Sequence, residues 1–153
     1  IDGLNSESFN PQQWMERVNE VLYKLGSNCQ QTISMGLVEL KNGVITYWNA
    51  DHIPIFVIEN RKGTEKVIEL DGRGKMMGLM EKITFTPISF SFDRDSQVHV
   101  LLGSDGVFIN NSYSEKDNVL EIFKSVVTAG EEGLRCIESD DDRTLLIMSK
   151  NAG

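Results

Sequence analysis

The most informative stretch of this sequence is Val-His-Val-Leu-Leu-Gly-Ser-Asp-Gly, residues 98–106. Residues 98–102 are nearly all apolar, which predicts a central strand that is covered on both faces. This strand ends at Gly103, and Asp105 follows closely. A carboxylate at the exit of a buried strand is a candidate ligand for a hard cation. An Asp-Gly pair in this position is also a common turn, so the pattern leaves both interpretations open.

A second acidic point lies near the end of the chain, where Asp141 and Asp142 precede an apolar run at residues 144–148. This run predicts a final strand. If the two strands are antiparallel neighbours, Asp105 and the Asp141-Asp142 pair meet at the same edge of a sheet, where they could share Mg²⁺ or Mn²⁺. The alternative interpretation is a solvated acidic loop, which is the commoner role of such a run.

The strongest helix signal lies near the start of the sequence. Asn10 as N-cap, Pro11 at the first helical position and Gly26 after the last turn predict a helix over residues 11–25. Apolar residues recur at helical spacing along it and predict one packing face. This face is formed by Trp14, Val18, Val21, Leu22 and Leu25.

The remaining signals are hairpins followed by helices. Two hairpins are predicted at residues 32–48 and 55–70, because apolar runs there flank turns that contain Asn and Gly. Two helices are predicted over residues 119–127 and 131–137. Hairpins followed by helices, without βαβ alternation, predict the α+β class, with helices packed on largely antiparallel sheet.

Composition and charge exclude several classes of protein. The chain has 153 residues, the size of one domain, and its 15 Lys and Arg against 23 Asp and Glu give a net charge of −8. Because phosphate backbones are bound by clustered Lys and Arg, this balance argues against a nucleic-acid partner. No apolar run reaches the ~18–20 residues of a membrane span, and the first residues do not form a signal peptide. We therefore expect a cytoplasmic protein without membrane insertion.

Residue identity around the two acidic points is more specific than the pattern alone. Four motifs occur in order, namely Asn49-Ala50-Asp51-His52-Ile53-Pro54, Gly78-Leu79, Ser104-Asp105-Gly106-Val107 and Asp141-Asp142-Arg143-Thr144. Together with the helix that holds Asn19, they resemble the motifs of bacterial metal-dependent serine/threonine protein phosphatases of the type 2C superfamily. The similarity is to the branch of the stage II sporulation E and sigma-regulator phosphatases, and it covers nearly the whole chain.

This resemblance implies a fold, a metal site and a reaction. The implied fold is an antiparallel β-sandwich flanked by helices, with metals bound by carboxylates at one end. Asp105 and Asp141 are implied as ligands in a site for two Mn²⁺ or Mg²⁺ ions. A metal-activated water would hydrolyse phosphoserine or phosphothreonine on a regulatory partner protein, such as an anti-sigma-factor antagonist, without a protein nucleophile.

Three residues depart from the family pattern. Asp51 stands where the family prefers glycine, Ser104 replaces threonine, and Arg143 brings a cation close to Asp141. The family's amino-terminal segment carries further metal ligands and has no counterpart before Asn10. We therefore expect residues 1–153 to be a carboxy-terminal portion of a single phosphatase-like domain. Sheet edges exposed in this way favour pairing with another chain, or with a second copy as a homodimer.

Two functions stay open on this basis. The first is an active phosphatase domain. The alternative is a catalytically degenerate module of the same fold that binds a signalling partner without hydrolysis, an interpretation supported by Asp51, Arg143 and the missing amino-terminal half of the site. His52 and His99 are isolated imidazoles and are expected to be structural.

Overall fold

The computed structural model describes residues 9–26, 31–108, 116–135 and 142–151. The chain divides into two compact units. The first is formed by the described residues up to His52 together with Gly72–Phe90, and the second by Ile53–Asp71 together with the described residues from Ser91 onward. Asp141, one of the two predicted metal ligands, lies outside the described residues. Within the described ranges, no helix is long and apolar enough to cross a membrane.

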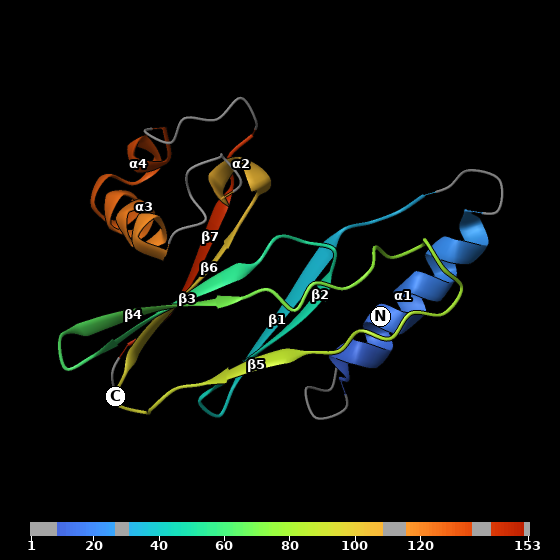
Figure 1. Cartoon of the computed structure of the whole chain (residues 1–153), viewed down its shortest axis with the longest axis horizontal. Coiled ribbons are helices and arrows are strands. Elements are labelled where there is room, and N and C mark those ends of the chain that lie inside the picture. The colour runs from blue at the N-terminus through green and yellow to red at the C-terminus, as the bar shows by residue number, and fades with distance from the viewer. Residues whose placement is uncertain (1–8, 27–30, 109–115, 136–141, 152–153) are drawn as a thin grey trace. The chain divides into compact units, whose positions relative to one another are not determined.

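The first unit contains one long helix and a three-stranded sheet (Figure 1). Helix α1 spans Pro11–Leu25, and the Asn10 side chain caps it by accepting a hydrogen bond from the Gln13 N–H. The sheet has the order β1-β2-β5, with β1 at Met35–Lys41, β2 at Val44–Ala50 and β5 at Ile88–Ser91. The antiparallel β1–β2 hairpin turns at Asn42 and Gly43, which have φ of 52° and 77°. Because tight hairpin turns require positive φ, this confirms the first predicted hairpin.

The packing face of α1 agrees with the predicted one only in part. Met15 and Asn19 are fully buried, whereas Trp14, Val21 and Leu25 are 42%, 56% and 67% exposed. Met15 belongs to the core of the first unit, which consists of Met15, Trp48, Ala50, Met77 and Phe85. Val18 and Leu22 of the predicted face do pack against this core, so the prediction is confirmed in part. The packing face also includes Asn19, a polar side chain that the prediction left out.

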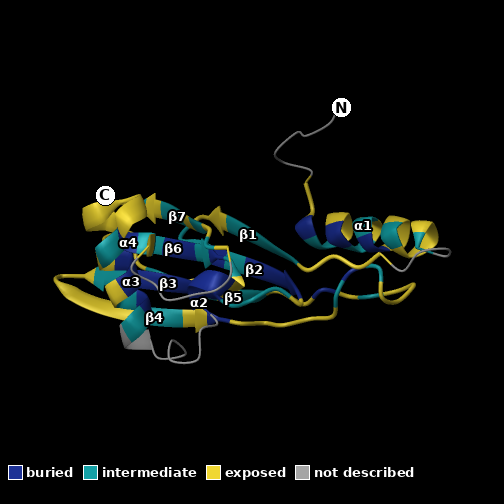
Figure 2. Ribbon diagram, turned by 90° about the horizontal axis from the view of Figure 1, so that it is seen from above, coloured by how far each residue is buried: buried dark blue, intermediate teal, exposed yellow. Residues whose placement is uncertain are grey.

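The second unit is built on a four-stranded sheet of order β4-β3-β6-β7, in which all neighbours are antiparallel (Figure 1). Its strands are β3 (Ile55–Arg61), β4 (Thr64–Leu70), β6 (Gln97–Gly103) and β7 (Leu145–Lys150). Strand β6 has a partner on each side and is largely buried, as Figure 2 shows, which confirms the central strand predicted from residues 98–102. The second predicted hairpin corresponds to β3 and β4 and is also confirmed.

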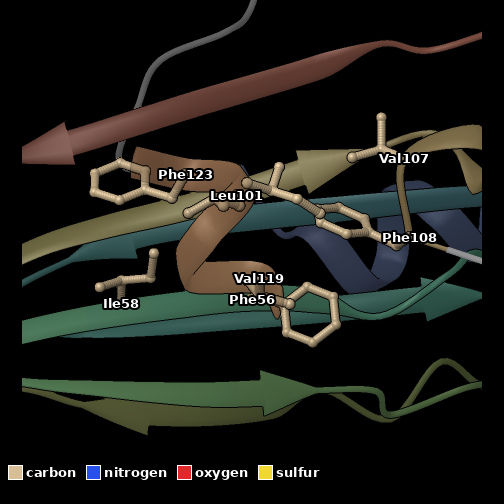
Figure 3. Close-up of a cluster of buried hydrophobic side chains, with 8 residues drawn as sticks. Phe56, Ile58, Leu101, Val107, Phe108, Val119 and Phe123 are labelled. Carbon is tan, nitrogen blue, oxygen red and sulfur yellow. The ribbon is translucent and has the colours of Figure 1, made fainter. Parts of the chain in front are cut away.

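Three helices accompany this sheet, namely α2 (Asp105–Phe108), α3 (Lys116–Ala129) and α4 (Glu131–Arg135). Helices α2 and α3 pack on the sheet through one apolar cluster (Figure 3). Its buried members are Phe56, Ile58, Leu101, Val107, Phe108, Val119, Ile122 and Phe123. The rings of Phe56 and Phe108 lie 4.9 Å apart between centroids. The predicted α+β class, with two antiparallel sheets and helices, is confirmed.

Candidate functional site

The exit of β6 is shaped by glycine and by the first turn of α2. A Cβ atom placed on Gly103 would lie 2.5 Å from Cε2 of Phe108, so only glycine allows this ring to cover the end of the strand. The Phe108 ring is in turn part of the apolar cluster. The Gly-Ser-Asp-Gly segment therefore turns the chain directly from the strand into α2, a helix that the sequence pattern did not predict.

Asp105 is the first residue of α2, and its side chain is exposed. Its Oδ1 atom accepts a hydrogen bond from the Gly106 N–H at 3.0 Å. This bond orients one carboxylate oxygen toward the backbone and leaves the carboxylate accessible from solvent. A carboxylate oriented in this way at the end of a rigid strand is suited to bind a hard cation.

Ser104 ties the end of β6 to the segment before β7. Its Oγ atom donates to the Asp142 carbonyl at 2.8 Å and accepts from the Thr144 N–H at 3.0 Å. The Ser104 N–H donates to the Thr144 carbonyl at 2.9 Å. These bonds bring the backbone of Asp142 beside the residue that precedes Asp105. The two predicted acidic points thus meet at one edge of the sheet as far as Asp142 is concerned, while the position of Asp141 is not described.

The acidic residues at this edge are of the chemical type that binds a hard divalent cation. Asp105 at the exit of β6 and Asp142, whose backbone lies beside Ser104, both carry carboxylates, which suit Mg²⁺ and Mn²⁺. In the described part of the chain, no three side chains of His, Cys, Asp or Glu gather closely enough to hold a metal ion. The edge therefore provides only some of the ligands that a metal ion needs. Asp141 stays a predicted further ligand.

A polar pocket adjoins this edge on the side of α4. It has a volume of about 230 Å³ and is lined by Glu131, Leu134, Arg135, Asp142 and Arg143. The Arg135 guanidinium is paired with Glu131 at 2.8 Å and with Glu132 at 3.0 Å. Arg143, one of the departures from the family pattern, thus lines a pocket beside α4.

The Asn-Ala-Asp-His motif in the first unit forms a clamped turn. The buried Asn49 side chain accepts from the His52 N–H at 2.6 Å and donates to the His52 carbonyl at 2.9 Å. Asp51 between them has φ of 54°, the left-handed conformation that glycine adopts at least cost. The Ser34 hydroxyl donates to the Asp51 carbonyl at 2.7 Å. The turn therefore keeps a glycine-like backbone although aspartate occupies it.

The Gly78-Leu79 motif is held by Asn19 of α1. Asn19 Oδ1 accepts from the Gly78 N–H at 2.8 Å, and Asn19 Nδ2 lies 3.0 Å from the Met80 carbonyl and 3.3 Å from the Glu81 carbonyl. These bonds explain why Asn19 faces inward. Sequence reasoning grouped Asn19 with the family motif but missed this contact, and the available signal was a polar residue at helical spacing from the buried Met15.

The family model of the stage II sporulation protein E (SpoIIE) matches residues 1–150. No curated protein matches the sequence.

Several solved structures share the fold. One contains the RsbU and RsbW domains of Rv1364c from Mycobacterium tuberculosis, with a TM-score of 0.64 and 19% identity over 96% of this chain and 44% of that one. A bacterial serine phosphatase has a TM-score of 0.62 and 17% identity, and the match covers 91% of this chain and 66% of that one. The PP2C phosphatase domain of SpoIIE from Bacillus subtilis, with a fragment of its regulatory domain, has a TM-score of 0.60 and 13% identity. This match covers 92% of this chain and 45% of that one. The chain thus spans less than two thirds of each of these three relatives, and at these identities the likeness shows the fold.

Proposed function

Because this chain belongs to the stage II sporulation protein E family, we propose that it carries out metal-dependent hydrolysis of phosphoserine or phosphothreonine on a protein substrate. The observation that supports this most is the exposed Asp105 carboxylate at the end of β6, next to the segment that Ser104 holds at Asp142. A phosphatase of this type needs acidic side chains on a rigid edge, and Asp105 supplies one such carboxylate at the end of β6.

The residues of the chain have distinct roles in this proposal. Asp105 and Asp141 would hold Mn²⁺ or Mg²⁺, and the ions, when bound, would acidify a water molecule and offset charge on the phosphoryl oxygens. The Gly106 N–H holds one Asp105 oxygen in place, which keeps the carboxylate oriented before a cation binds. The domain prediction stays part of the proposal, with further ligands supplied by a part of the phosphatase domain outside residues 1–153.

A phosphorylated regulatory protein is the proposed substrate. One relative combines RsbU and RsbW domains, and another is described as a key regulatory component of a type VI secretion system in Pseudomonas aeruginosa. The pocket between α4 and Arg143 lies beside Asp142 and can receive residues that flank the phosphorylated side chain. An anti-sigma-factor antagonist is the partner that the family resemblance favours.

Hydrolysis by the full-length protein tests this proposal. We expect Mn²⁺-dependent release of phosphate from p-nitrophenyl phosphate and from a phosphoserine peptide, and a loss of at least about 100-fold in Asp105→Asn and Asp141→Asn. Asp95→Asn is the matched control, because Asp95 is an exposed aspartate at the opposite end of β6. Full activity in both site variants would contradict the assignment of the metal ligands.

The binding module without hydrolysis is the second candidate. It is favoured by Arg143, whose cation lines the pocket next to Asp142 and can bind a phosphate without a metal. Asp51 gives it less support than the sequence suggested, because the turn at this residue has a glycine-like φ. Binding of a phosphoserine peptide in the presence of EDTA, without phosphate release when Mn²⁺ is added, would select this candidate.

A further inference from the structure

Ser104 stands where the chain changes from strand to helix. The last backbone pair of β6 and β7 joins Gly103 to Leu145, and the next pair along the two strands would be Ser104 and Thr144. In a regular antiparallel sheet, two residues of a hydrogen-bonded pair donate to each other's carbonyls. The Ser104 N–H does donate to the Thr144 carbonyl at 2.9 Å, but the Thr144 N–H donates to Ser104 Oγ at 3.0 Å.

The side chain of Ser104 thus replaces its own carbonyl in the sheet. The carbonyl has turned away and accepts from the Val107 N–H at 3.0 Å, within the first turn of α2. The same hydroxyl donates to the Asp142 carbonyl at 2.8 Å. One side chain therefore lets the backbone leave the strand at Ser104 and still holds the opposite strand in register.

We propose that Ser104 is the positioning residue of the metal edge, the end of β6 at Asp105 together with Asp142, because its hydroxyl holds the backbone of Asp142 relative to Asp105. The proposal rests on the function proposed above. The role assigned to Ser104 is positioning, since its hydroxyl hydrogen and one of its two acceptor lone pairs are used by backbone groups. Groups that orient metal ligands in this way typically change metal affinity when they are lost.

Threonine can replace Ser104 in this role, but alanine cannot. Threonine keeps the hydroxyl, whereas Ser104→Ala leaves the Asp142 carbonyl without its donor and the Thr144 N–H without its acceptor. We expect Ser104→Ala to weaken Mn²⁺ binding by about 10- to 100-fold. Ser104→Thr should bind Mn²⁺ within about twofold of the wild type, because both hydrogen bonds are kept.

Ser149→Ala is the matched control for a purely structural effect. The Ser149 hydroxyl lies on β7 and is hydrogen-bonded across to His99 Nδ1 on β6 at 2.7 Å. This substitution therefore removes a serine hydroxyl that joins the same two strands away from the metal edge. It should lower the thermal stability without a change in Mn²⁺ affinity.

The experiment measures Mn²⁺ binding by isothermal titration calorimetry and hydrogen exchange of the Thr144 amide in the full-length protein and the three variants. The proposal predicts faster Thr144 exchange and weaker Mn²⁺ binding in Ser104→Ala alone. If Ser104→Ala loses no more affinity than Ser149→Ala, Ser104 has only a structural role and the inference is wrong. If the wild type binds no Mn²⁺, the proposed metal-dependent function itself fails and this inference falls with it.

Discussion

Replacing Gly78 by alanine tests how α1 is joined to the loop beneath it. Gly78 has φ of 81°, and its N–H donates to Asn19 Oδ1 at 2.8 Å. A Cβ atom at this position would overlap the Gln31 carbonyl oxygen and lie 3.2 Å from Cβ of Leu22. Since the Gln31 carbonyl belongs to the backbone, alanine fits only if the loop moves away from the helix.

The magnitude follows from two costs. A left-handed φ costs an L-residue roughly 1–2 kcal/mol. Movement of the loop breaks the hydrogen bond from the Gly78 N–H to the fully buried Asn19 side chain. A buried polar group that loses its hydrogen-bond partner costs about 1–3 kcal/mol. We therefore expect Gly78→Ala to lower the free energy of unfolding by about 2–5 kcal/mol.

Gly63→Ala provides the matched control. Gly63 also has φ of 81°, but no atom lies within 4 Å of the position that its Cβ would take. Gly63→Ala should lower the free energy of unfolding only by the conformational cost, roughly 1–2 kcal/mol. The assay is urea denaturation of both variants and the wild type, with the slopes checked for equality. Equal losses in the two variants would refute the close approach of the loop to α1 and Gln31.

Two further predictions concern titration and backbone conformation. Burial lowers the pKa of His99 below its ordinary value of 6.5. The negative charge of Glu65 acts in the opposite direction and raises this pKa by less. The unfolded chain therefore takes up this proton first as the pH falls, so the free energy of unfolding should decline from about pH 6.5 downward until the folded pKa is passed. His99→Gln should remove that part of the decline in urea titrations at pH 7.5 and 5.5, and an unchanged decline would count against the buried imidazole. Asp51→Gly should stabilise the protein by about 0.5 kcal/mol while Asp51→Ala destabilises it, because Asp51 has φ of 54°; the reverse order of melting temperatures would show that the turn is not left-handed.

The elements that the sequence predicts well are those set by neighbouring residues. The Asn42-Gly43 turn requires positive φ at both residues, and glycine and asparagine supply it locally. The strand predicted at residues 98–102 is found as β6, Gln97–Gly103, because an almost continuous apolar run can be covered only between other elements. The same run also predicts that Asp105 lies just beyond the end of the strand, and it is the first residue of α2, two residues after Gly103. Its role as a metal ligand stays a prediction.

The elements that the sequence misses depend on contacts between distant residues. Helix α2 contains Gly106, which has low helix propensity, and it is held by the Phe108 ring over Gly103. The inward position of Asn19 on α1 depends on partners that lie about 60 residues later in the loop at residues 78–81. The role of Ser104 depends on its hydrogen bonds to residues 142 and 144, about 40 residues later in the chain. The residues next to Ser104 in the sequence therefore do not indicate this role.

The central claim is that the exit of β6 binds the metal ions of a phosphatase, and anomalous X-ray scattering from Mn²⁺ tests it most directly. Crystals of the full-length protein grown with Mn²⁺ would be measured on the high-energy side of the manganese absorption edge. The account predicts an anomalous peak at coordination distance from the Asp105 carboxylate, and the loss of that peak in Asp105→Asn. A fully occupied Mn²⁺ site elsewhere on the protein, with no peak at Asp105, would contradict it.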